Sequence, residues 1–169
     1  AGSGIYLATS KSAIAQGQAA GRTVKAALIG CGAQGDRLRA SSKFMKTGLQ
    51  WVAVCDIWEQ QTRKMGAYMR TENKHQVEGE VKSYTSVEEM LAKQPEIEAV
   101  FIATPDFLHA HYSRLCLEKG KAVYVEKRMS NTIEGARDMV KDGKETGGIF
   151  QIGHQRRLQQ PGVPLARGE

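Results

Sequence analysis

The sequence contains no hydrophobic stretch long enough to cross a membrane. A membrane-spanning helix needs about 20 consecutive apolar residues, and no run approaches that length. Hydrophobic residues make up 41% of the chain and charged residues 25%, which is the composition of an ordinary globular domain. The chain has 169 residues, enough for one domain with a core and barely enough for a second. We therefore expect one globular domain without a membrane partner.

Cysteine is also scarce, and its spacing excludes the usual metal and redox motifs. The three cysteines, Cys31, Cys55 and Cys116, are far apart and lie in apolar or glycine-containing contexts. The sequence has neither a C-x-x-C pair nor the cysteine and histidine spacing of a zinc site. We therefore predict no metal site and expect the three thiols to be small buried hydrophobic groups.

A block of basic residues with interleaved aromatic residues is missing too, although the chain is basic overall. The formal net charge is +6 and the isoelectric point is about 9.3. The lysines and arginines are spread along the chain between acidic residues, and no nucleic-acid-binding module is recognisable. We therefore expect no nucleic-acid partner. A net positive charge also favours the binding of a ligand that carries a pyrophosphate.

The two ends of the chain have compositions unlike the middle. The first residue is Ala1, and residues 1–22 are rich in small residues without a helical or strand period. The tripeptide at 13–15 matches the small-x-small pattern of a signal-peptidase site. We expect residues 1–22 to be the remnant of an export signal, which favours a periplasmic or exported protein; the alternative is a flexible arm on a cytoplasmic one. Residues 158–169 contain two prolines and two glycines and predict an irregular tail.

Between these ends, strand and helix patterns alternate. The expected strands span 24–30, 49–56, 82–85, 97–104, 121–127 and 148–154, and the expected helices span 34–45, 59–73, 86–94, 106–120 and 131–144. Ser86 and Glu89 have the spacing of a capping box. This alternation over short links predicts a parallel sheet with helices on both faces and right-handed crossovers. Six strands is the count of the doubly wound Rossmann fold, so we predict one α/β domain of that class over residues 23–157.

A glycine motif directly follows the first expected strand. The stretch VKAALIGCGAQGDRL places Gly30, Gly32 and Gly35 in the pattern G-x-G-x-x-G. In a strand–turn–helix context the first glycine permits a tight turn, the second lets the backbone approach a pyrophosphate, and the third lets the helix pack close to the strand. The N–H groups and the dipole at the helix start favour a phosphate. The motif alone is weak evidence, since a plain turn can contain chance glycines.

The end of the second expected strand supports the dinucleotide interpretation. Asp56 lies 21 residues after Gly35, where an acidic side chain can accept hydrogen bonds from the adenosine ribose hydroxyls. An aspartate there can also be an ordinary helix cap. Ile57 and Trp58 follow it, and neither is basic, so NAD is preferred over NADP. The basic pair at 63–64 (Arg63 and Lys64) keeps the NADP alternative open.

Taken together, these motifs resemble the N-terminal half of the Gfo/Idh/MocA oxidoreductase family. The similarity extends through VFIATPDFLHAHYSRLCLEKGKAVYVEK and QIGHQRR and covers residues from about 24 to 157. The more discriminating marks are Thr104-Pro105 followed by His109, and the Glu126-Lys127 pair.

The resemblance implies roles for these residues. Lys127 would lie near the nicotinamide and a substrate hydroxyl and is the candidate catalytic residue for moving that proton. His109 would contact the cofactor or only pack the turn, His111 would be a surface or structural residue, and Arg157 would contact the ligand or be a solvated linker charge. The expected cofactor contacts are Gly30, Cys31, Gly32, Ala33, Gln34, Gly35, Asp56, Thr104, Pro105, His109, Glu126 and Arg157.

The chain also departs from the family pattern. Arg128 stands where the family usually has proline. The resemblance also implies a second domain that carries most substrate contacts, and we expect this chain, which stops at Glu169 where that domain should begin, to be a truncated product or fragment. We therefore expect the NAD-binding domain of an enzyme that transfers hydride between a sugar or polyol and a nicotinamide, with little or no turnover by this chain alone. An NAD-dependent glycosidase and a non-catalytic nucleotide-binding fragment are the alternatives. Homo-oligomers are expected for full-length relatives.

Overall fold

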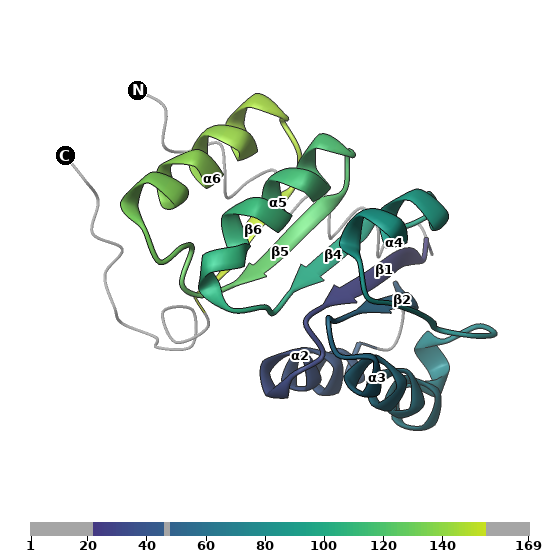
Figure 1. Ribbon diagram of the computed structural model, residues 1–169. Coiled ribbons are helices and arrows are strands. Elements are labelled where there is room, and N and C mark those ends of the chain that lie inside the picture. Colours follow the sequence, from purple (N-terminus) through teal and green to yellow (C-terminus); the bar gives the residue numbers. More distant parts are fainter. Residues whose placement is uncertain (1–21, 46–47, 155–169) are drawn as a thin grey trace, which may run out of the picture.

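The computed structural model describes residues 22–45 and 48–154 (Figure 1). The predicted export-signal remnant, apart from its last residue, lies outside this part of the chain, as do Arg157 and the predicted irregular tail. The elements named below all belong to the described part. None of the helices found there is long and apolar enough to cross a bilayer.

Six strands form a single parallel sheet in the order β3-β2-β1-β4-β5-β6. The strands are β1 (Val24–Ile29), β2 (Leu49–Cys55), β3 (Lys82–Tyr84), β4 (Ala99–Ile102), β5 (Ala122–Glu126) and β6 (Phe150–Gly153). The direction in which strands are added reverses between β1 and β4, and in open α/β sheets ligands bind beyond the carboxyl ends of the strands at such a point. The predicted Rossmann fold is confirmed.

Helices cover both faces of this sheet. The helices are α2 (Ala33–Ser42), α3 (Glu59–Glu72), α4 (Val87–Lys93), α5 (His109–Glu118) and α6 (Ile133–Glu145), with short 3-10 turns η1 (Lys74–Gln76) and η2 (Asp106–Leu108). Helices α2 and α3 pack on one face, and α4, α5 and α6 pack on the other (Figure 1).

The core consists of two hydrophobic clusters separated by the sheet. Leu28 packs with Trp51 and Met65 on the α2–α3 side, whereas its neighbour Ile29 packs with Ile102 on the α4–α6 side. Successive side chains of a strand point to opposite faces, and all five of these residues are at most 2% exposed. A strand buried on both faces needs apolar residues throughout, which explains the apolar run that follows Lys25 in β1.

Two local predictions need correction. The helix expected over 106–120 is divided into η2 and α5, because Pro105 adopts an extended conformation with ψ 146° and the chain turns before the α-helix begins. The capping box at α4 is only half formed. The Ser86 hydroxyl accepts a hydrogen bond from the Glu89 N–H at 3.1 Å, but the Glu89 carboxylate accepts from Lys93 at 2.6 Å instead of returning to the cap.

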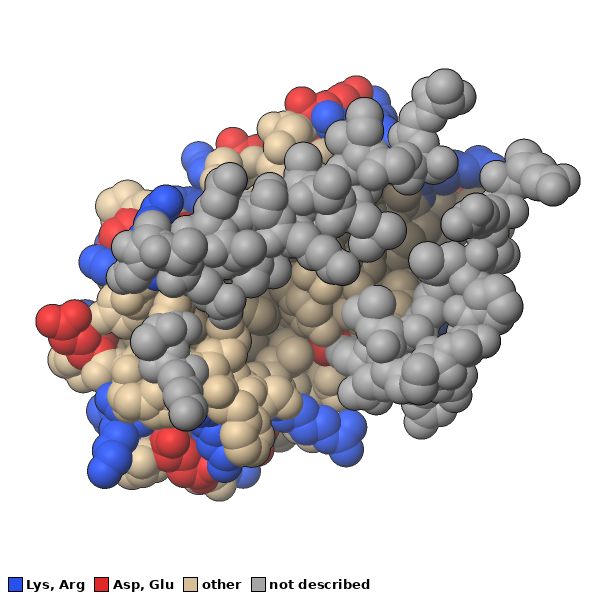
Figure 2. Space-filling view, turned by 180° about the vertical axis from the view of Figure 1, so that it is seen from behind, with Lys and Arg blue, Asp and Glu red and all other residues tan. Residues whose placement is uncertain are grey.

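Charged side chains of both signs are mixed on the surface. On the face shown in Figure 2, lysines and arginines lie among aspartates and glutamates around the rim and are not collected in one patch. The alternating charges noted in the sequence therefore remain interspersed on this face of the folded domain.

Candidate nucleotide-binding site

The glycine turn begins where three strands end side by side. Gly30 has φ +91°, and a Cβ on it would lie 2.6 Å from the carbonyl oxygen of Ala103, so only glycine fits there. The Gly30 N–H donates to the Cys55 carbonyl at 2.8 Å, and the Ala103 N–H donates to the Ile29 carbonyl at 2.8 Å. The turn is thereby fixed against the carboxyl ends of both β2 and β4.

The other two glycines have different surroundings, as the motif predicts. A Cβ on Gly35 would lie 2.0 Å from the Gly30 carbonyl oxygen, so the first turn of α2 packs directly on the glycine turn. A Cβ on Gly32 would meet nothing within 4 Å. Gly32 is the N-cap of α2 and has no side chain to cover the N–H groups of the first helical turn. The open space over Gly32 therefore fits a pyrophosphate, and a side chain would obstruct it.

The Asp56 carboxylate is held against this turn by backbone hydrogen bonds. Its Oδ2 accepts from the Cys31 N–H at 2.7 Å, and its Oδ1 accepts from the Trp58 N–H at 2.9 Å. Each carboxylate oxygen can accept a further hydrogen bond. The two oxygens are thus oriented before any ligand binds and can receive two adjacent hydroxyl groups.

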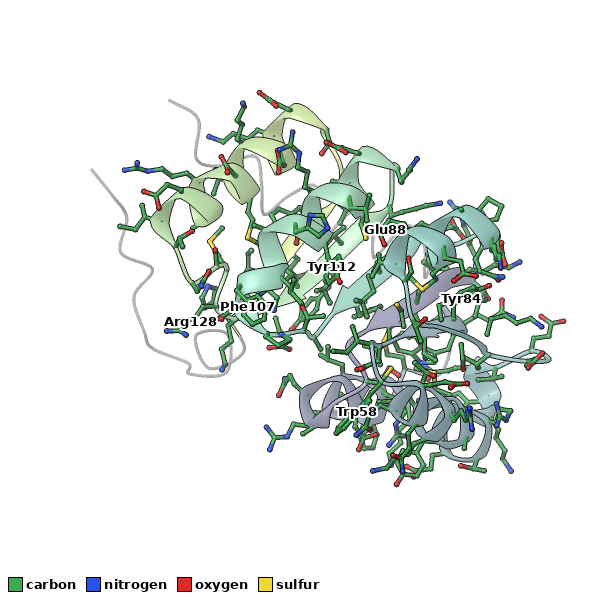
Figure 3. All side chains as sticks on the ribbon, viewed as in Figure 1. Trp58, Tyr84, Glu88, Phe107, Tyr112 and Arg128 are labelled. Carbon is green, nitrogen blue, oxygen red and sulfur yellow. The ribbon has the colours of Figure 1, made fainter. Side chains whose placement is uncertain are left out.

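The residues around Asp56 favour a ribose without a 2′-phosphate. Ile57 and Trp58 are 86% and 67% exposed, and Trp58 lies at the start of α3 (Figure 3). The two basic residues that left NADP as an alternative cofactor, Arg63 and Lys64, both contact other side chains. Arg63 donates to Glu59 at 2.5 Å, and the Lys64 ammonium lies 5.6 Å from the centre of the Tyr68 ring.

The end of β4 adds a polar group beside the glycine turn. The Thr104 amide nitrogen would lie 2.9 Å from a Cβ on Gly30, so Thr104 directly adjoins that turn. Its hydroxyl oxygen is buried and has no hydrogen-bond partner within the described residues. Buried hydroxyl groups normally have a partner, and a ligand in the crevice could supply one. Pro105, which follows, is exposed.

The end of β5 carries the predicted catalytic lysine. Glu126 is 3% exposed, its carboxylate accepts from the Tyr124 hydroxyl at 3.2 Å, and the Lys127 N–H approaches it at 3.4 Å. Lys127 itself is exposed, and the peptide bond between Lys127 and Arg128 is cis. Since β5 lies next to β4 in the sheet, Lys127 follows a strand end on the same edge as Thr104.

His109, predicted as a cofactor contact or as a packing residue, is 1% exposed. Its Nδ1 lies 2.6 Å from the Arg128 carbonyl oxygen and its Nε2 lies 2.9 Å from the Thr104 carbonyl oxygen. Both ring nitrogens therefore face backbone carbonyls. His111 on the same helix is exposed, and its Nε2 lies 3.9 Å from the Glu88 carboxylate. A contact between His109 and a cofactor stays a prediction.

Sequence reasoning missed the ion pair between Asp106 and Arg128. The Arg128 guanidinium donates to Asp106 Oδ2 from Nε at 3.0 Å and from Nη2 at 2.6 Å. Arg128 lies beside the turn that carries Phe107 (Figure 3). The two residues are 22 positions apart, and no local pattern marks such a pair.

The cysteines near the site are unsuited to nucleophilic chemistry. Burial, with the nearby Asp56 charge as a smaller cause, raises the pKa of the Cys31 thiol far above its ordinary value and that of Cys55 to about 12. Both thiols are neutral at physiological pH and act as buried apolar groups, as predicted. The described residues contain no group of three or more side chains that could hold a metal ion.

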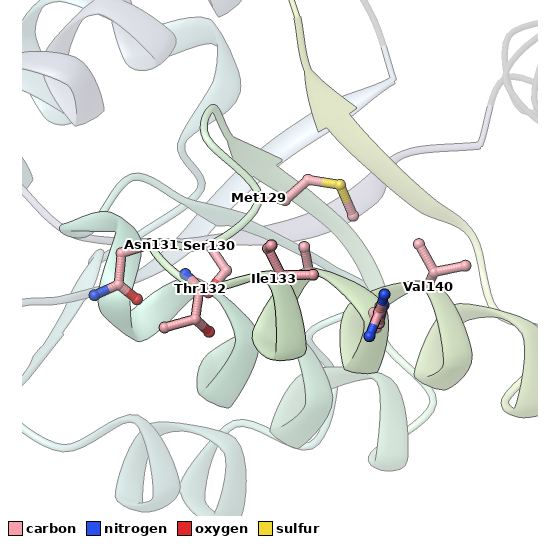
Figure 4. Close-up of a pocket in the computed structure, with 8 residues that line it drawn as sticks. Met129, Ser130, Asn131, Thr132, Ile133 and Val140 are labelled. Atoms are coloured by element: carbon pink, nitrogen blue, oxygen red, sulfur yellow. Dashed lines mark hydrogen bonds between the residues drawn. The ribbon is translucent and has the colours of Figure 1, made fainter.

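A separate hollow of about 580 Å³ lies along α6 (Figure 4). Its apolar lining includes Met129, Ile133 and Val140, and the polar residues 130–132 lie together at one end (Figure 4). Ile133 is 67% and Val140 is 46% exposed. Its first lining residue along the chain, Met129, lies two positions after Lys127. The hollow is an open surface groove and does not enclose a small molecule.

Residues 24–154 match a family model, GFO_IDH_MocA, that describes an oxidoreductase family with an NAD-binding Rossmann fold. The chain belongs to this family. The predicted resemblance is confirmed, and NAD is the cofactor that the Rossmann domain of the Gfo/Idh/MocA family binds. The match covers the glycine turn, Asp56, the Thr104-Pro105 turn and Lys127.

Several proteins of known activity are similar to this domain of the Gfo/Idh/MocA family. A 1,5-anhydro-D-fructose reductase from Ensifer adhaerens is 37% identical over 54% of the chain and 26% of its own length. An inositol 2-dehydrogenase from Rubrobacter xylanophilus is 28% identical over 82% of the chain and 37% of its own length. The crystal structure of myo-inositol dehydrogenase from Lactobacillus casei, in complex with NAD(H) and myo-inositol, superposes with a TM-score of 0.69 at 27% identity over 82% of the chain and 38% of its own. The chain thus spans between 26% and 38% of the length of these relatives.

Proposed function

We propose that this chain is the NAD-binding domain of an oxidoreductase that moves hydride between a sugar or polyol carbon and a nicotinamide. The observation that carries the proposal is the Asp56 carboxylate, which the Cys31 N–H holds at 2.7 Å beside the open space over Gly32. A pyrophosphate and an adenosine ribose need this combination of uncapped helix N–H groups and a pre-oriented acid.

Each group in the crevice has a separate task in holding the cofactor. The N–H groups at the start of α2 bind the pyrophosphate, and Asp56 accepts hydrogen bonds from the two ribose hydroxyls. The Thr104 hydroxyl, which has no hydrogen-bond partner among the described residues, adds a polar contact where the crevice passes between β1 and β4. When bound, NAD supplies the carbon that takes or gives the hydride.

Lys127 handles the proton in this proposal. A carbinol carbon that loses hydride must also lose the hydroxyl proton, and a carbonyl carbon that gains hydride needs a proton on its oxygen. A lysine can accept the proton as the amine in the first direction and donate it as the ammonium in the second. Lys127 is assigned to this task by its place directly after β5, on the edge of the sheet that carries the crevice, and by the family resemblance. Glu126, buried immediately before it, fixes the end of the strand through its contacts with Tyr124 and the Lys127 N–H.

The substrate class comes from the relatives. The reductase from Ensifer adhaerens is named for an anhydro sugar and the dehydrogenases for inositol, so a polyhydroxylated ring is the proposed substrate here. The groove along α6 is too open to enclose such a ring, and the described residues offer no enclosure for the substrate there. We expect this chain to bind the cofactor with little turnover.

Calorimetric titration with NAD⁺ and NADP⁺ tests the proposal. We expect NAD⁺ to bind more tightly than NADP⁺, and Asp56→Ala to weaken NAD⁺ binding about 10- to 100-fold, because it removes two hydrogen bonds to a charged group. Asp138→Ala, which removes an exposed aspartate on α6, is the matched control and should bind as the wild type does. Circular dichroism checks that both variants are folded. Absence of nucleotide binding by the wild type, or equal binding by Asp56→Ala, would contradict the proposal.

A further inference from the structure

Two turns lie next to each other at the edge of the sheet that carries the site. One follows β4 and comprises residues 104–108, and the other follows β5 and comprises residues 127–130. Strands β4 and β5 are parallel neighbours with Ile102 opposite Val125, so both turns emerge on the same side. Lys127 is the first residue of the second turn.

Contacts from two directions fasten the second turn to the first. From the solvent side, the Arg128 guanidinium places two nitrogens within 3.0 Å of one Asp106 carboxylate oxygen. From the interior, the His109 ring lies between the Arg128 carbonyl and the Thr104 carbonyl, at 2.6 and 2.9 Å. Arg128 is therefore held through both its side chain and its backbone.

The buried histidine and the exposed ion pair hold the second turn in different ways. His109 is 1% exposed, so its ring is fixed by the core, whereas the Arg128 side chain is 78% and the Asp106 side chain 25% exposed. Exposed ion pairs contribute little to overall stability. The pair can still decide where a short turn lies, because a turn has few other contacts that restrict it.

The Asp106–Arg128 pair also differs from the ion pairs along the helices. Arg114 and Glu118 are four residues apart on α5 with Nε and Oε1 at 2.9 Å, so their interaction links neighbouring turns of one helix. Asp106 and Arg128 are on different turns, and their interaction links the segment after β4 to the segment after β5. The Arg114–Glu118 pair, whose side chains are 61% and 55% exposed, is therefore a control for the removal of an exposed ion pair that does not join the two turns.

We propose that Asp106, Arg128 and His109 form a clamp that positions Lys127 at the nicotinamide half of the site. Arg128 directly follows Lys127, so fixing the backbone and side chain of Arg128 restricts where the Lys127 ammonium can lie. The three residues are positioning residues and act on the ligand through Lys127. The inference rests on the proposed function, because it assumes that Lys127 borders the nicotinamide.

The test uses the complete 169-residue chain and compares two sets of variants. The clamp set is Asp106→Asn, Arg128→Gln and their combination, and the control set is Glu118→Gln, Arg114→Gln and their combination. The first measurement is amide hydrogen exchange in residues 127–130. The second is calorimetric affinity for NAD⁺ and for ADP-ribose, which shares the adenosine and both phosphates but lacks nicotinamide.

The clamp variants should change both measurements, and the control variants neither. We expect roughly three- to fivefold faster exchange at 127–130 and roughly three- to fivefold weaker NAD⁺ binding, since an exposed ion pair contributes up to about this factor. ADP-ribose affinity and the melting temperature should stay unchanged. The double variant should be no worse than either single variant, and Arg128→Lys should recover part of the NAD⁺ affinity.

The outcomes separate this inference from the proposed function. If NAD⁺ binds the wild type but the clamp variants match it in exchange and in the ratio of NAD⁺ to ADP-ribose affinity, the clamp is overturned and the NAD-binding domain stands. Equal weakening of both ligands would also overturn it, because the effect would not be specific to the nicotinamide half. If the wild type binds neither ligand, the proposed function fails, and the placing of Lys127 against nicotinamide fails with it.

Discussion

His109 and His111 show how two identical side chains on one helix acquire different surroundings. Both lie in the first turn of α5, two positions apart. His109 is 1% exposed with each ring nitrogen facing a backbone carbonyl, whereas the His111 side chain is 63% exposed. A neutral imidazole carries one N–H and can donate to one of the two carbonyls, and a ring protonated on both nitrogens can donate to both.

We predict that His109→Ala lowers the free energy of unfolding by about 2–4 kcal/mol. The substitution leaves a cavity where a buried ring was and removes a hydrogen-bond partner from the part-buried Thr104 and Arg128 carbonyls. His111→Ala, the control, should change the free energy of unfolding by less than about 0.5 kcal/mol because its side chain is exposed. Urea unfolding followed by circular dichroism measures both. Equal effects of the two substitutions would contradict the packing described for His109.

At the scale of elements, the β1–α2 unit combines a structural requirement with a functional one. Gly30 and Gly35 fit because backbone atoms occupy the positions that their side chains would take. Gly32 has an ordinary φ of −74° and open space around it. The fold therefore needs the outer two glycines, whereas the requirement for the middle one is a prediction that rests on the proposed ligand.

We predict that Gly32→Ala and Gly35→Ala separate these two requirements. Gly35→Ala should destabilise the domain by about 3 kcal/mol, because the new methyl overlaps the Gly30 carbonyl and the helix must shift. Gly32→Ala should change stability by less than about 1 kcal/mol, since reduced unfolded-state entropy offsets the poorer N-cap, yet it should weaken NAD⁺ binding at least about tenfold. Thermal unfolding and calorimetry measure the two effects. Unimpaired NAD⁺ binding by Gly32→Ala would show that no phosphate occupies the space over this residue.

At the scale of the whole molecule, both halves of the core contain thiols that the fold keeps protonated. Cys31 lies in the cluster beneath α2 and α3, and Cys55 and Cys116 lie in the cluster beneath α4, α5 and α6. Burial is the largest cause of the raised pKa in each case, to about 12 for Cys55 and Cys116. The ordinary value is 9.0, so the unfolded chain loses these protons at lower pH than the folded domain.

We predict that the free energy of unfolding falls as the pH rises above about 9. Between the ordinary and the raised pKa the unfolded state binds fewer protons, so each thiol contributes a decrease that approaches about 1.4 kcal/mol per pH unit. Below the ordinary pKa the thiols contribute no pH dependence. Urea titrations from about pH 8 to pH 10.5 measure the slope, and Cys116→Val, which keeps the site apolar, should reduce the thiol contribution by about a third. An identical slope for Cys116→Val and the wild type would contradict this account.

The sequence by itself determined the fold class and the placement of the glycine turn beside Asp56, because these depend on signals that are local along the chain; that these residues contact a nucleotide stays a prediction. Apolar runs predict the strands, and the segments of helical periodicity between them predict the crossover helices. The strand–turn–helix spacing then places the glycine turn and Asp56. Local reasoning was less accurate where a neighbouring contact competes, as at α4, where the Glu89 carboxylate pairs with Lys93.

Only the tertiary structure decided which distant residues meet. The Asp106–Arg128 pair and the His109 contact to the Arg128 carbonyl exist because β4 and β5 pair in a particular register. Arg39 likewise became 3% exposed because α2 packs against the end of α3, where its guanidinium donates to Asn73 at 2.8 Å. Such contacts join residues 19 to 34 positions apart, and their geometry is set by strand order and helix packing, for which the local sequence carries no signature.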